Sequence, residues 1–194
     1  MIKSIQASSH KFIFIGIFFL VLVFSSGIYA KDSLNVISKC DDEYEMSCNI
    51  YSSVGNNVKK VLEKVKSPVI SKVNDNFFHV KTSCGSPCQI HFFINEYGED
   101  FTDEYIVLNK KDYCLIESDS EKKVVYARSL FGGEKKVLIN LKEQEYKVLP
   151  SKLNYYSDFN EMSFFDENNN LHLIANDYGK ILVNKVLKNP CKSK

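Results

Sequence analysis

Apolar and polar residues alternate in short runs along most of the chain, from residue 69 to residue 187. Each run is rich in Val, Ile, Phe and Tyr, and turn signals such as Gly132-Gly133 separate the runs. Short, evenly spaced runs of this kind are typical of antiparallel β proteins. The pattern predicts a mainly β fold, an antiparallel meander that forms a sandwich, a barrel or propeller-like blades. The expected strands are 69–73, 76–83, 89–95, 104–109, 113–118, 122–130, 135–141, 145–149, 162–166, 171–176 and 180–187.

The segment 76–98 predicts a hairpin with a disulfide at its tip. Direct pairing of Cys84 with Cys88 fixes the register of the whole hairpin, and the alternation of the pleat then sorts its side chains onto two faces. One face is apolar and the other is mixed. The apolar pairs are Phe78 with Ile94, Val80 with Phe92 and Thr82 with Ile90, and the mixed pairs are His79 with Phe93, Lys81 with His91 and Ser83 with Gln89.

Residues 56–66 have the spacing of one short helix. Val58, Val61, Leu62 and Val65 recur at intervals of three and four residues, with lysines between them, and Pro68 would end the helix. The same residues are also compatible with a strand.

Residues 1–30 have the three parts of a secretory signal peptide: flanking lysines, an apolar run over residues 12–24, and small residues up to Ala30. We expect cleavage after Ala30, which leaves a single disulfide-linked β domain over residues 31–194 in the periplasm or outside the cell. The apolar run extended to Ala30 nearly reaches the length of a membrane span, so an uncleaved anchor is the alternative.

Six cysteines lie beyond the signal segment, and an even number in an exported protein indicates disulfides. Six cysteines allow fifteen connectivities. The sequence alone does not choose among them, and we expect two local pairs and one long-range pair. A structural disulfide is favoured for Cys84 and Cys88 because Cys84-x-x-x-Cys88 lies between strand-like runs and lacks the spacing of a redox or zinc motif. The expected disulfides are Cys40 with Cys48, Cys84 with Cys88 and Cys114 with Cys191.

Charge argues against a nucleic-acid partner. Removal of Lys3 and Lys11 with the signal segment leaves 23 of the 25 basic residues against 24 acidic ones. A protein that binds a phosphate backbone needs a basic surface, and Arg128 is the only arginine in the chain. We therefore expect no nucleic-acid partner and, after signal cleavage, no membrane association.

Catalytic motifs are missing from the sequence. It contains no G-x-S-x-G elbow, no H-E-x-x-H helix, no phosphate loop and no dinucleotide fingerprint. The mature histidines are His79, His91 and His172, so a hydrolase would have to use one of them. We expect a non-catalytic protein without metal or cofactor, and keep a periplasmic hydrolase as an alternative.

Aromatic residues supply the candidate contact surface, because aromatic anchors dominate the energetics of protein interfaces. The mixed face of the hairpin carries Phe77, His79, Lys81, His91 and Phe93, and it is either covered by another layer or exposed as a contact patch. A second candidate is the pair Tyr155-Tyr156, in the polar region 151–161.

The element FHVKTSCGSPCQIHFF resembles one found in small exported bacterial β proteins, in which a strand ends in Cys-Gly-[Ser/Thr]-x-Cys and returns as a second strand. The resemblance covers about twenty residues and implies a periplasmic β domain without a defined activity. By analogy, some proteins of this build are immunity proteins that neutralise a toxin. We therefore expect an immunity-type inhibitor that binds another protein, with a secreted or surface module recognising host protein or glycan as the alternative.

Overall fold

The computed structural model describes residues 32–86, 88–143, 146, 159, 162–177 and 179–192, with the side chain of Asp177 excepted. Apart from a 3₁₀ assignment at Tyr146, the regular elements in these ranges are β-strands, so the prediction of a mainly β fold is confirmed. The strands are β1 (Leu34–Cys40), β2 (Cys48–Val54), β3 (Asn57–Asn74), β4 (Phe77–Ser83), β5 (Gln89–Asn95), β6 (Glu99–Thr102), β7 (Tyr105–Asn109), β8 (Cys114–Asp119), β9 (Val124–Ser129), β10 (Lys136–Asn140), β11 (Phe164–Phe165), β12 (Leu171–Asp177) and β13 (Lys180–Leu187).

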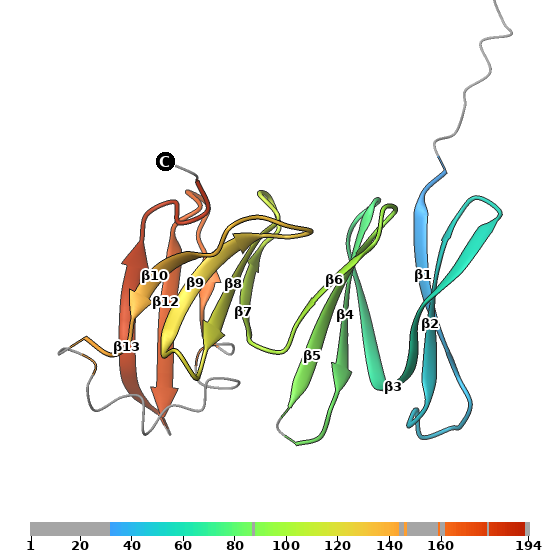
Figure 1. The fold of residues 1–194 in the computed structure, drawn as a ribbon, viewed down its shortest axis with the longest axis horizontal. Helices are drawn as coiled ribbons and strands as arrows, with labels where there is room; N and C mark the ends of the chain where they lie inside the picture. Colours follow the sequence, from blue (N-terminus) through green and yellow to red (C-terminus); the bar gives the residue numbers. More distant parts are fainter. Residues whose placement is uncertain are drawn as a thin grey trace, which may run out of the picture. The chain divides into compact units, whose positions relative to one another are not determined.

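The strands form three antiparallel sheets, and none of the three is closed into a barrel (Figure 1). The first sheet has the order β1-β2-β3-β4-β5-β6, the second β10-β9-β8-β7 and the third β11-β12-β13. Within each sheet, every strand therefore pairs with its neighbours in sequence, as a meander requires. Contacts group residues 33–194 into one compact unit.

The β4–β5 hairpin has the register that the cysteine pair predicts. Phe78 pairs with Ile94, His79 with Phe93 and Lys81 with His91. The expected apolar face is buried, because Phe78, Val80 and Ile94 pack with Leu34, Val36 and Ile50 from β1 and β2 in one apolar cluster. The two halves of the first sheet thus share a core.

Residues 57–74 form the single long strand β3, so the helix expected over 56–66 is wrong and its strand alternative is correct. The cause is a set of β-bulges: the β2–β3 register shifts on both sides of Ile50, and Lys64 and Ser67 have positive φ angles of 51° and 45°. Extra residues at bulges break the two-residue alternation of a strand. Val61, Leu62 and Val65 therefore have a helix-like spacing although they are partly buried residues of a strand.

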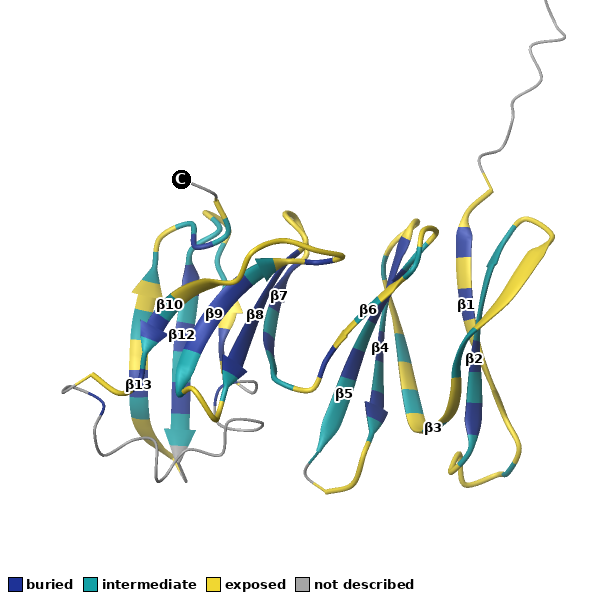
Figure 2. Ribbon diagram, in the orientation of Figure 1, coloured by how far each residue is buried: buried dark blue, intermediate teal, exposed yellow. Residues whose placement is uncertain are grey.

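The other apolar clusters connect the three sheets. Phe77 and Phe93 of the first sheet pack with Leu108 and Leu115 of the second sheet. They also pack with Leu130, which directly follows β9. The opposite side of the second sheet shares a larger cluster with β12 and β13. Strand β8 is buried almost throughout because it contributes to both clusters (Figure 2).

Most strands expected from 69 to 187 have a counterpart in the structure, although 69–73 is the end of the longer β3 and 162–166 shortens to β11, Phe164–Phe165. Strand β6, Glu99–Thr102, was not expected because its sequence EDFT is mostly polar. The strand expected over 145–149 lies outside the described ranges apart from Tyr146. The signal segment 1–30 also lies outside them, and within the described part of the chain no helix meets the length and hydropathy of a membrane span.

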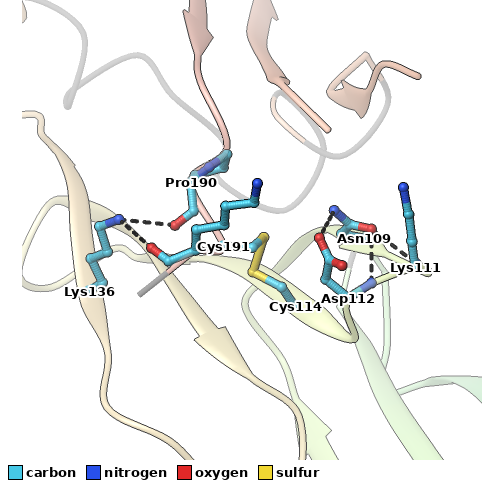
Figure 3. The surroundings of a disulfide bond; sticks show 8 residues. Asn109, Lys111, Asp112, Cys114, Lys136, Pro190 and Cys191 are labelled. Atoms are coloured by element: carbon cyan, nitrogen blue, oxygen red, sulfur yellow. Dashed lines mark hydrogen bonds between the residues drawn. A yellow bond between two sulfur atoms is a disulfide. The ribbon is translucent and has the colours of Figure 1, made fainter. Parts of the chain in front are cut away.

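All three expected disulfides are present: Cys40–Cys48, Cys84–Cys88 and Cys114–Cys191. The third connects β8 to the segment after β13, and beside it the Lys136 ammonium donates to the backbone oxygens of Pro190 and Lys192 (Figure 3). Three disulfides are more typical of extracellular or periplasmic proteins than of cytosolic ones.

The double substitution Cys114→Ser with Cys191→Ser should destabilise the protein by about 4.5 kcal/mol, because this disulfide closes a loop of 77 residues. The matched change of Cys84 and Cys88 should cost only about 2 kcal/mol, because that loop is very short. Urea unfolding of both variants measures the difference. Equal losses would contradict the loop-entropy account.

Candidate functional site

The mixed face of the β4–β5 hairpin is covered, so the alternative of an exposed contact patch is wrong for its central residues. Phe77, Phe93 and His91 are only 2%, 0% and 3% exposed, and His79 and Lys81 are half-buried. The physical reason is the second sheet, whose leucines pack on the two phenylalanines. Tyr155 and Tyr156 lie outside the described residues.

His79 and His91 form a stacked pair in this covered face. The Nε2 atom of His79 lies 2.9 Å from Nδ1 of His91, a distance that requires one ring to donate and the other to accept. His91 also stacks on Tyr105 of β7, with ring centroids 4.1 Å apart, and His79 stacks on Phe93. The pair therefore belongs to the contact between β4, β5 and β7.

The environment of the pair disfavours positive charge. Burial, together with the smaller effects of the charges on nearby Lys81 and Lys110, lowers the pKa of His79 to about 4. Burial likewise lowers the pKa of His91 to about 3, together with the charges of His79 and Lys81. Both rings are neutral at pH 7, and protonation of either weakens the packing.

The third histidine lies on another sheet and has its own partners. His172 of β12 stacks on Phe164 and lies 3.2 Å, Nε2 to Oδ2, from Asp166. The nearby hydroxyl of Ser163 accepts from the Ile174 N–H and donates to the Ile174 oxygen. Within the described ranges, no group of three or more His, Cys, Asp or Glu residues is arranged to hold a metal ion.

A cleft of about 850 Å³ lies where β6 meets β8 and β9. Its lining is rich in acidic side chains: Glu99, Asp100, Asp103, Glu104 and Glu117. The basic side chains of the lining are Arg128 and Lys135. The cleft therefore has a surplus of negative charge.

Arg128 organises the floor of this cleft. Its Nε donates to Oε2 of Glu117 at 2.9 Å, and its Nη1 donates to Oδ2 of Asp100 at 2.5 Å. Further bonds from the guanidinium reach the second oxygen of each carboxylate and the backbone oxygen of Phe101. Asp100 belongs to β6, whereas Glu117 and Arg128 belong to β8 and β9, so this ion-pair network connects the first sheet to the second.

Burial and hydrogen bonding act in opposite directions on these groups. Burial alone raises the pKa of Asp100, but hydrogen bonds from Arg128 and from the Phe131 N–H outweigh burial and hold the pKa below its usual value. Burial lowers the pKa of Arg128, and its bonds to Asp100 and Glu117 more than reverse that effect. Two carboxylates on one guanidinium leave the network with one negative charge.

A fourth group adds to the negative potential. Burial raises the pKa of Glu104, and the nearby charges of Asp119 and Asp103 raise it further, although the Ser120 N–H bonds to its carboxylate. Beside it, the Lys135 ammonium donates to the Tyr126 hydroxyl at 2.7 Å. The inner wall of the cleft thus favours a positively charged ligand group.

Exposed aromatic side chains surround the mouth of the cleft. Tyr97 is 88% exposed, Phe101 64% and Phe131 41%. Large aromatic residues at such exposure stabilise the fold little, and they are enriched at protein interfaces. The cleft therefore combines apolar anchors with a charged floor.

The sequence contained one signal for this site, the single arginine of the chain at position 128. Its two carboxylate partners were not identifiable, because Asp100 and Glu117 come from strands of different sheets. Comparison with protein-family models, curated proteins and solved structures found no match for this chain. Functional inference therefore depends on the geometry of the chain itself.

Replacement of Arg128 by Leu should destabilise the fold by about 3 to 5 kcal/mol, because it leaves the Glu117 carboxylate, which is 2% exposed, buried without its cationic partner. Urea unfolding at pH 7 measures the loss. The matched control is Lys122→Leu, which removes an ion pair with Asp119 whose lysine is 77% exposed, and its effect should be much smaller. Similar losses in the two variants would contradict a stabilising role for the Arg128 network.

Acidification from pH 6.5 to 4.5 should destabilise the protein through His79 and His91. Their pKa values lie near 4 and 3 in the folded protein and near 6.5 when unfolded, so the unfolded chain binds more protons in this range. Each histidine then contributes a slope of at most about 1.4 kcal/mol per pH unit, reached near pH 5, with stability lost as the pH falls.

Urea unfolding at several pH values measures that slope. The control is His79→Gln with His91→Asn, in which amides replace the two bonded ring nitrogens without titrating, and the slope should flatten. A second control, His172→Gln, tests whether the effect belongs to the stacked pair. An unchanged slope in the double variant would rule out the pair as its source.

Proposed function

We propose that this chain is an exported, non-catalytic binding protein that recognises another protein through the cleft above Arg128. Its most specific form is a periplasmic, immunity-type inhibitor that neutralises a toxin by covering part of its surface. Export is supported by the signal-like segment and the three disulfides. The small exported β proteins with the Cys-Gly-Ser-x-Cys element support the immunity-type form by analogy.

The observation that carries the proposal is the exposure of Tyr97, Phe101 and Phe131 around a charged cleft. Energetically important interface residues are typically aromatic or arginine side chains surrounded by a polar rim. Complementary charge in such a cleft accelerates association and selects partners. A partner with a basic surface loop satisfies both features.

The bonding of the candidate catalytic groups supports a non-catalytic role. His79 and His91 bond to each other in a covered face, and His172 lies beside Asp166 and Phe164. Arg128 has its guanidinium bonded to two carboxylates and a backbone oxygen. A hydrolase mechanism that used His79 or His91 as a base would require the two rings to separate.

Photo-crosslinking tests the binding surface. With p-benzoylphenylalanine at position 97 or 101, the protein should crosslink one specific protein in the compartment to which it is exported. The matched control carries the same group at position 58, because Val58 on β3 is 68% exposed and lies outside the lining of the cleft. The proposal fails if positions 97 and 101 give no protein adduct, if position 58 gives the same adduct with equal yield, or if the partner is a glycan.

Toxicity measurements test the immunity-type form. The captured protein should harm cells when it is expressed alone, and co-expression of the native chain should protect them. The variant Tyr97→Ala with Phe101→Ala should fold normally, because both side chains are exposed, and should lose protection. If the captured protein is harmless, the immunity-type form is wrong and the proposal of a binding protein stands without it.

A further inference from the structure

A smaller pocket of about 300 Å³ adjoins the acidic cleft. The two share Asn95, Tyr97 and Phe131 in their linings, so a single ligand can occupy both. Half of the residues that line the smaller pocket are aromatic. Phe77 and Leu130 are its buried residues, and Tyr113 and Phe131 are its partly exposed ones.

The aromatic walls are held in place by specific contacts. Tyr113 and Phe131 both meet the ring of Phe77 edge-on, with centroid distances of 5.2 and 6.1 Å. The Tyr113 hydroxyl accepts a hydrogen bond from the Asn74 side chain at 2.6 Å, and the Phe131 N–H donates to Asp100 at 2.7 Å. The second bond connects the pocket directly to the Arg128 network.

Tyr113 and Phe131 have backbone conformations that bulky residues rarely adopt. Their φ angles are +49° and +61°, in the left-handed region that favours glycine or asparagine. Both side chains remain about 40% exposed, so burial offsets this strain only in part. Strained residues of this kind are concentrated at binding and catalytic sites.

Volume and charge specify the occupant. A pocket of this size is at the lower end of the range for small-molecule sites, and its aromatic walls suit one large apolar side chain. Glu96 lies in its lining, and the adjoining cleft carries the surplus of carboxylates. A positive charge next to the apolar group would therefore bind favourably, whereas a negative charge would be repelled.

We infer that the smaller pocket receives one aromatic or large aliphatic side chain of a protein partner, and that a basic side chain next to it in the partner enters the acidic cleft. This inference rests on the proposed binding function and specifies the partner's recognition element. The native chain thus binds two neighbouring residues of the partner, one apolar and one cationic.

Titration with capped dipeptides, followed by amide NMR, tests the inference directly. N-acetyl-Phe-Arg-amide should shift the signals of Asn95, Gly98, Tyr113 and Gly132, and should bind at least tenfold more tightly than N-acetyl-Phe-Glu-amide or N-acetyl-Ala-Arg-amide. Equal binding of the Arg and Glu peptides overturns the cationic half. Equal binding of the Phe and Ala peptides, or shifts confined to other regions, overturns the apolar half.

The variant Phe131→Gly removes one wall and relieves the backbone at the same position, so it should remain folded in thermal unfolding and bind N-acetyl-Phe-Arg-amide at least tenfold more weakly. Phe131→Asn, which also tolerates the left-handed region, serves as a second variant. The matched control is Phe164→Ala, an aromatic residue of β11 that is 47% exposed, and it should bind like the native protein. Unchanged affinity in both Phe131 variants overturns the inference.

The inference and the proposed function fail separately. A specific adduct at positions 97 and 101, without preference among the dipeptides, supports the binding function and overturns the recognition element. Dipeptide preference without any protein adduct supports the recognition element and overturns the proposed binding of a protein through the cleft. Concentration-dependent dimerisation that competes with N-acetyl-Phe-Arg-amide would identify a second copy as the occupant, and would overturn a different protein as partner.

Discussion

The arrangement of this protein depends on the burial of both faces of the β4–β5 hairpin. One face carries Phe78, Val80 and Ile94, and the other carries Phe77 and Phe93. A strand that is apolar on both sides requires a layer on each, because exposed apolar area is unfavourable in water. Strands β1 and β2 supply one layer and the second sheet supplies the other. Strand β8 is likewise apolar on both sides and requires a layer on each. The third sheet supplies its second layer.

The Arg128 network stands where the first two sheets meet, and its position explains the chemistry of the cleft. An isolated buried charge is costly, so a buried carboxylate such as Glu117 needs a close cationic partner with several hydrogen bonds. A planar guanidinium can satisfy two carboxylates at once. The network contains one positive charge, on Arg128, and two negative ones, on Asp100 and Glu117. An ion-pair network that stabilises the fold therefore also gives the floor of the cleft a net negative charge, beneath the exposed aromatic rings.

The parts of the fold that were predictable are those determined by local periodicity and covalent geometry. The hairpin register followed from Cys84 and Cys88 together with two-residue alternation, and the structure confirms it. The long strand β3 was misread as a helix because bulges change that alternation. The cleft could not be predicted, because Asp100 and Glu117 approach each other only after two sheets pack. Sequence periodicity carries no information about such a contact between sheets.

Strand β6 and the turn before it place two kinds of residue within a few positions of each other. Asp100 is tied to Arg128 and to the Phe131 backbone, whereas Tyr97 and Phe101 project into solvent. A substitution at Asp100 disturbs the joint between two sheets, whereas one at Tyr97 or Phe101 leaves the core as it is. Under the proposed binding function, a point mutation at the rim of the cleft would therefore change ligand preference without a loss of foldability.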